Sequence, residues 1–157
     1  MQNIRGIGWV VAVILLSACA TTRQAGDPMS GSAAAGRTAS TPAEQKKANL
    51  AEQKLSRGID NYENGNFKLS EEELRSAVHL GLPNKRDEVS AHKYLAFAYC
   101  VSKRKLQCRY EFRKALKLDP NFSLKPSEAG HPIWGPIFAS EKSRSAKSVK
   151  YAKLNTH

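Results

Sequence analysis

The stretch from His92 to Pro120 constrains the fold more than any other part of the chain, because two helical patterns follow one another in it. In each pattern, apolar or bulky residues recur three or four positions apart, which is the spacing of one face of an α-helix. The run from Val101 to Lys105 between them is too polar to bury. Asp119-Pro120 ends the second pattern, because proline lacks an N–H and disfavours helix in the residue before it. The stretch predicts an antiparallel helix pair.

The order of residue types on this pair resembles the tetratricopeptide repeat (TPR), a helix–turn–helix unit of about 34 residues. The resemblance implies that small residues let the two helices approach, while aromatic residues fill the space toward the next repeat. His92 departs from the family pattern, which usually has a bulkier apolar residue there. The packing roles of this repeat fall on Leu95, Ala96, Tyr99, Cys108, Phe112, Ala115 and Pro120.

A weaker copy of the same pattern lies upstream, with Gly58 in the role of Ala96 and Leu74 in that of Phe112. The copies are a few residues further apart than the usual period, and the breaker-rich segment 81–85 is the expected insertion. A single helix pair cannot bury its own apolar face, so two stacked pairs are expected. The packing roles of this first repeat fall on Gly58, Tyr62, Phe67, Leu74 and Ala77.

The N-terminal segment, residues 1–18, is expected to be a lipoprotein signal peptide. Arg5 precedes an apolar run of signal-peptide length, and Leu16-Ser17-Ala18-Cys19 ends it. This ending resembles the bacterial lipobox, which implies cleavage before Cys19 and a lipid on its sulfur. Ala20, in place of aspartate, favours the outer membrane in such families. An ordinary signal peptide and an uncut membrane anchor remain alternatives.

The predicted fold is all-α: a TPR-like array of two helix pairs with a C-terminal capping helix. The small polar residues that follow Cys19 predict a flexible linker. Thr41-Pro42-Ala43-Glu44 then predicts a helix start with a capping box. The expected parts are 19–41 for the lipidated cysteine and disordered linker, 42–146 for the TPR-like domain, about 51–83 and 89–121 for its repeats, 122–146 for the capping segment, and 147–157 for a basic disordered tail.

Two further helix features are predicted. A second helix is expected roughly from Leu69 to Leu80, with Glu71-Glu72-Glu73 in its first turn as a solvated cap that suits the helix dipole. A last helix is expected near Trp134 to Ser145. Its apolar face would cover the preceding helix, with Trp134 near Phe112 and Leu116. The alternative is an exposed hook that docks a partner. The capping residues are Trp134, Ile137 and Phe138.

The chain carries no motif of a common enzyme class: it has no Gly-rich phosphate loop, nucleophile elbow or HExxH. We therefore expect a protein that is not an enzyme and that has no cofactor and no metal. Cys100 and Cys108 flank the turn of the second helix pair, and an even pair of thiols in an oxidising compartment favours a disulfide. Two buried, reduced cysteines are the alternative.

The function predicted from the TPR resemblance is that of a non-enzymatic scaffold on the periplasmic face of the outer membrane, assisting an assembly such as a secretion system or pilus. Its partner would be another envelope protein, bound through the concave face by Lys54, Asn61, His92 and Lys93. The net charge of +11 supports an alternative, a binder of anionic envelope polymers such as peptidoglycan, lipopolysaccharide or anionic lipid. A structural lipoprotein without a dedicated ligand is a third possibility. Nucleic acid is not expected as a partner.

Overall fold

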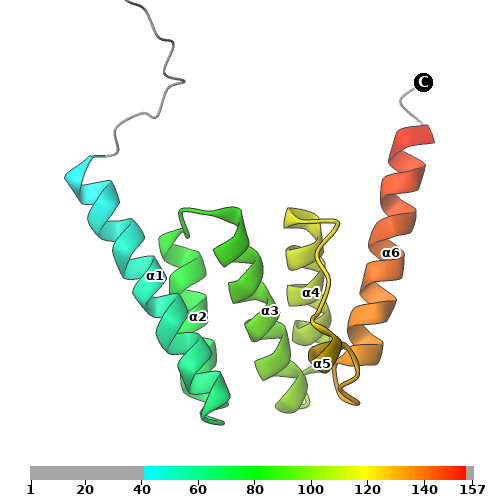
Figure 1. Cartoon of the computed structure of the whole chain (residues 1–157), viewed down its shortest axis with the longest axis horizontal. Coiled ribbons are helices and arrows are strands. Elements are labelled where there is room, and N and C mark those ends of the chain that lie inside the picture. Colours follow the sequence, from blue (N-terminus) through cyan, green and yellow to red (C-terminus); the bar gives the residue numbers. More distant parts are fainter. Residues whose placement is uncertain (1–40, 155–157) are drawn as a thin grey trace, which may run out of the picture. The chain divides into compact units, whose positions relative to one another are not determined.

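The computed structural model describes residues 41–154, without the side chains of residues 149 and 152–154. The expected signal peptide, Cys19 and all but the last residue of the expected linker lie outside this range. The described residues form six helices and no strand, which confirms the all-α prediction (Figure 1). The helices are α1 (Pro42–Glu63), α2 (Phe67–Leu80), α3 (Lys85–Val101), α4 (Lys105–Leu118), α5 (Pro126–Ala129) and α6 (Gly135–Leu154).

Helix α1 begins with the predicted capping box. The backbone N–H of Glu44 donates to the Thr41 hydroxyl oxygen, and the Thr41 N–H donates to the Glu44 carboxylate at 2.7 Å. Pro42 occupies the first turn, where its missing N–H costs nothing. After the helix, Gly65 adopts a φ of +77°, a left-handed conformation that only glycine takes at little cost. Local residue chemistry therefore accounts for both ends of α1.

Successive helices pack on one another in chain order. Helix α1 packs mainly on α2, α3 packs mainly on α4, and α2 and α3 join the two pairs. Helices α1 to α4 alternate in direction, whereas α6 runs parallel to α4 and packs on it (Figure 1). The segment between α4 and α6 runs antiparallel to α4, in the direction that the first helix of another pair would take (Figure 1). The core contains the fully buried side chains of Leu74, Phe97, Phe112 and Leu116.

Helix α2 begins two residues before the predicted start, which moves Glu71 to Glu73 out of the first turn. The interpretation of this triplet as a solvated cap is wrong for two of its members. Glu71 accepts a hydrogen bond from the Tyr99 hydroxyl at 3.1 Å and pairs with Arg104. Glu73 lies 2.9 Å from Lys54 Nζ. Tertiary packing, and not the helix end, therefore positions Glu71 and Glu73, whereas Glu72 is exposed.

Helix α6 continues to Leu154, beyond the predicted end near Ser145. The expected disordered tail of residues 147–157 is therefore wrong for residues 147–154, and residues 155–157 lie outside the described range. Pro136 stands in the first turn as expected, and no glycine or proline follows it in the helix. A run of lysine, alanine and serine can propagate a helix that packing has already started.

The predicted disulfide is present. The sulfur atoms of Cys100 and Cys108 lie 2.01 Å apart, and their Cα atoms lie 5.2 Å apart. The bond joins the last turn of α3 to the first turn of α4, across a turn in which Lys103 has a φ of 61°. It holds together the ends of two helices that are already antiparallel neighbours.

Candidate binding site on helix α3

The residues assigned to repeat packing lie mostly in the interior, where helices meet. Tyr62 and Phe67 are half-buried, with ring centroids 5.6 Å apart, and Pro120 is exposed just after the end of α4. The buried members are Gly58, Leu74, Ala77, Leu95, Ala96, Tyr99, Cys108, Phe112 and Ala115.

His92 is not available to a partner, contrary to the prediction. Its side chain is buried, with 3% of the residue exposed, and Nδ1 lies 2.5 Å from the Glu111 carboxylate of α4. Helix α4 covers this face of α3, so the imidazole meets a carboxylate 19 residues away in the chain. At the position where a tetratricopeptide repeat usually has a bulkier apolar residue, this chain therefore has one member of a buried polar pair.

Lys93 is also buried, contrary to the prediction that it faces a partner, and 8% of the residue is exposed. Its Nζ lies 2.6 Å from the Glu128 carboxylate and 4.4 Å from the centroid of the Tyr94 ring. Glu128 also accepts the Lys125 backbone N–H at 3.0 Å. Lys93 therefore attaches α5 to α3 and contributes to holding the α4–α6 connection in place.

The two expected partner-binding residues on α1 are half-buried and engaged within the fold. Lys54 pairs with Glu73 of α2. The Asn61 amide donates to the backbone carbonyl of Arg57, one turn earlier, at 2.8 Å. All four expected residues thus make polar contacts within the fold.

Trp134 is buried against α3. Its ring stacks on Phe97 with centroids 4.5 Å apart, and its Nε1–H donates to the Glu128 carbonyl at 3.0 Å. With 7% of the residue exposed, it lies in the interior and not on an exposed hook. Phe138 packs on Phe112 with ring centroids 5.2 Å apart, whereas Trp134 stacks on Phe97 of α3, in the same buried cluster as its predicted neighbours Phe112 and Leu116.

Phe97 and Trp134 belong to a cluster of aromatic rings that extends toward α1. Tyr62 contacts both Tyr94 and Phe97, at centroid distances of 5.4 Å and 5.8 Å. Burial raises the pKa of Tyr62 to about 12, and the neighbouring Tyr94 and the Glu128 carboxylate add to the shift. Burial likewise raises the pKa of Tyr94. Both hydroxyls are therefore protonated at neutral pH, and the two tyrosines add no charge to the aromatic cluster.

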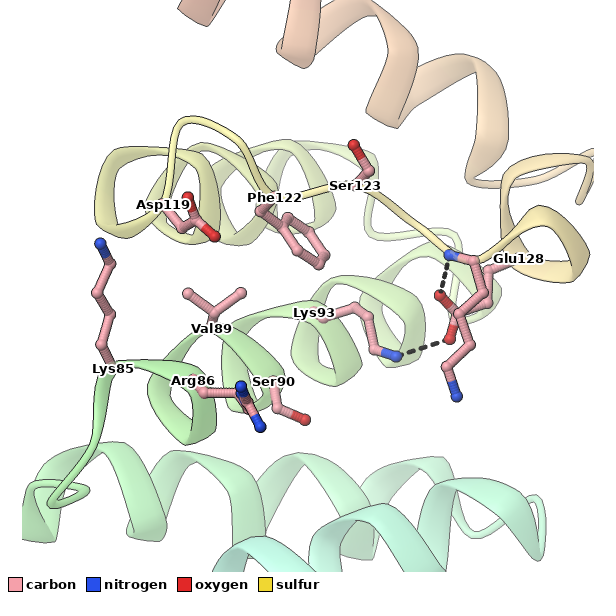
Figure 2. Close-up of a pocket in the computed structure, with 10 residues that line it drawn as sticks. Lys85, Arg86, Val89, Ser90, Lys93, Asp119, Phe122, Ser123 and Glu128 are labelled. Atoms are coloured by element: carbon pink, nitrogen blue, oxygen red, sulfur yellow. Dashed lines mark hydrogen bonds and ion pairs between the residues drawn. The ribbon is translucent and has the colours of Figure 1, made fainter.

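A pocket of about 490 Å³ opens between the N-terminal half of α3 and the segment 119–128 (Figure 2). Val89 and Phe122 supply apolar surface from its two sides. Lys85, Arg86 and Lys125 line it and are exposed, and within the described range none of them has an ion-pair partner. The remaining lining residues are Ser90, Lys93, Asp119, Ser123 and Glu128.

The pocket is not predicted by the sequence patterns, although some of its residues stand out in the sequence. Pro120 and Pro126 indicate an extended segment, and Phe122 is an apolar residue within it. Nothing in the local pattern indicates that this segment lies on α3. The contact depends on Lys93 meeting Glu128, which is 35 residues further along the chain.

Within residues 41–154, no group of His, Cys, Asp and Glu side chains is arranged to hold a metal ion. None of the helices in the described part of the chain is both long and apolar enough to span a membrane. Comparison of the chain with protein-family models, curated proteins and solved structures finds no match.

Proposed function

We propose that this protein is a non-enzymatic binding module whose α3 pocket takes a segment of another protein. The observation that carries the proposal is the pocket itself, with apolar surface from Val89 and Phe122 and unpaired cations at Lys85, Arg86 and Lys125. Its volume is in the range of pockets that enclose small ligands or a few side chains. An acidic segment with one large apolar side chain complements both features.

The setting that we propose is the periplasmic face of the bacterial outer membrane, where the module would assist an assembly such as a secretion system or pilus. The lipobox-like ending at Cys19 supports a lipid anchor. The Cys100–Cys108 pair supports an oxidising compartment, because disulfides persist there and are rare in the cytosol. The stacked helix pairs support a TPR-like scaffold, in which binding surfaces form along successive helices.

Photo-crosslinking tests the pocket. A photoreactive amino acid at Ser90, which lines the pocket, should give a discrete adduct with an envelope protein. The same group at Ser56, exposed on α1, should not give that adduct. The charge-reversed variant K85E/R86E should reduce the Ser90 adduct at least tenfold. Glutamates in the first turn of α3 suit the helix dipole, so loss of folding would not explain the result.

The matched control is K46E/K47E, which makes the same charge change at exposed positions of α1. It should leave the Ser90 adduct unchanged. The proposal fails if no adduct is specific to Ser90, or if the two double variants lose the adduct equally, because general charge would then explain capture.

A further inference from the structure

The last two long helices have a charge distribution unlike that of the first two. Helices α4 and α6 each contain five lysines or arginines and one carboxylate. Both carboxylates, Glu111 and Glu141, are buried. Helices α1 and α2 together contain six basic and seven acidic residues. The exposed surface of α4 and α6 therefore carries cations without an exposed carboxylate to balance them.

Two exposed apolar side chains lie within this cationic surface. Leu106 is 79% exposed, and Tyr110, one turn later, is 51% exposed. The Lys114 Nζ lies 4.9 Å from the centroid of the Tyr110 ring. Leaving a leucine in water forgoes the stabilisation that its burial would contribute. Nothing in the described fold covers this turn of α4.

The cations around these residues form one continuous surface. A shallow hollow of about 420 Å³ is lined by Tyr110, Arg113, Lys114 and Lys117. A second hollow, of about 360 Å³, shares Arg113 and Lys117 and adds Arg144 of α6. We call this the outer α4 surface, and it consists of Leu106, Tyr110, Arg113, Lys114, Lys117 and Arg144.

We infer that the outer α4 surface docks on an anionic lipid bilayer. Basic side chains that surround exposed apolar ones are typical of helices that lie at a membrane interface. The cations would meet lipid phosphates, and Leu106 and Tyr110 would enter the boundary between headgroups and acyl chains. Charge complementarity selects this occupant, and a soluble polyanion would offer no apolar layer to Leu106. The surface shares no residue with the α3 pocket, so the two proposals can fail separately.

Vesicle co-sedimentation of the full chain tests the inference. The readout is the excess of binding to vesicles of phosphatidylcholine with phosphatidylglycerol over binding to phosphatidylcholine alone. The N-terminal apolar run is common to all variants and does not affect their comparison. We expect K114E/K117E to lower the excess by about tenfold or more, because each basic residue near an anionic leaflet contributes about 1 kcal/mol. Leu106→Asn should lower it severalfold.

The control is again K46E/K47E, which should retain the anionic-lipid preference because those lysines lie on α1. Equal losses in the two double variants would overturn the inference, since the total charge alone would then drive binding. Competition by soluble polyphosphate, together with indifference to Leu106→Asn, would also overturn it in favour of a polyanion site. Equal binding to both kinds of vesicle would overturn the inference as well, because the surface would then have no preference for anionic lipid.

Discussion

Polar pairs that each include a buried carboxylate join the helices of this protein. His92 meets Glu111 between α3 and α4, and Arg109 Nη1 lies 2.7 Å from the buried Glu141 carboxylate between α4 and α6. Desolvation opposes such pairs, so their net contribution to stability is small, but removing one partner is costly. A polar pair can instead specify which residues face each other across a helix interface.

His92→Leu should lower the free energy of unfolding by about 1–3 kcal/mol, because it leaves the Glu111 carboxylate buried without its partner. Glu111→Leu should cost a similar amount. The double variant His92→Leu/Glu111→Leu should recover most of the loss, since an apolar pair replaces a polar one. Urea unfolding with the disulfide intact measures the cycle. Additive losses in the double variant would show that the two side chains do not depend on each other.

At the scale of the element, helices α1 and α2 approach each other closely at Gly58. A Cβ added at Gly58 would lie 2.5 Å from Leu74 Cγ and 3.1 Å from the Leu74 backbone nitrogen. The buried hydroxyl of Ser70 donates to the Gly58 carbonyl at 2.7 Å. Since Leu74 is fully buried and its backbone is part of the contact, it has little room to move away. Only glycine at position 58 permits this spacing.

Gly58→Ala should therefore destabilise the protein, by about 1–2 kcal/mol net. A free helix would gain roughly 0.5–1 kcal/mol from the same change, while forcing a methyl group into a packed interface costs about 1–3 kcal/mol. Thermal unfolding followed by circular dichroism measures the result. The exposed Ser56→Ala in the same helix should be neutral or slightly stabilising. A rise in melting temperature for Gly58→Ala would contradict the close approach.

At the scale of the whole molecule, the segment 119–134 links α4 and α6 and also contacts α3. Lys93 binds Glu128, Phe97 stacks on Trp134, and α6 then covers α4. Two Lys142 hydrogen bonds, to the carbonyls of Pro120 and Phe122, attach the same segment to α6. Two helix pairs alone would leave an apolar face exposed at the end of the array. Trp134 covers this face on α3, and α6 covers it on α4.

Trp134→Ala should cost about 3–5 kcal/mol, the usual penalty for truncating a buried tryptophan. Its neighbour Ile133 is 46% exposed, so Ile133→Ala is the matched control and should change stability little. In a Trp9→Phe background, where Trp134 is the remaining tryptophan, fluorescence should be blue-shifted in the native protein and shift to the red on unfolding. Acrylamide quenching as efficient as that of free tryptophan would contradict its burial.

Local chemistry in the sequence was sufficient for much of this fold. Thr41 to Glu44 predicted where α1 begins, Pro120 predicted the end of α4, and the cysteines that flank one turn predicted the Cys100–Cys108 bond. Each of these features depends on residues within one or two turns of each other. Helical spacing of apolar residues likewise predicted the all-α class, because it reports which face of a helix avoids water.

Only the tertiary structure decided which polar residues are accessible. His92 and Lys93 are polar residue types that were predicted to face a partner, but the groups that they meet, Glu111 and Glu128, lie 19 and 35 residues away in the chain. The same long-range contacts bring Phe122 opposite Val89 and so create the α3 pocket. The sequence determined the helices by short-range periodicity and capping, whereas the sites depend on which helix faces meet, and that follows from packing of the whole chain.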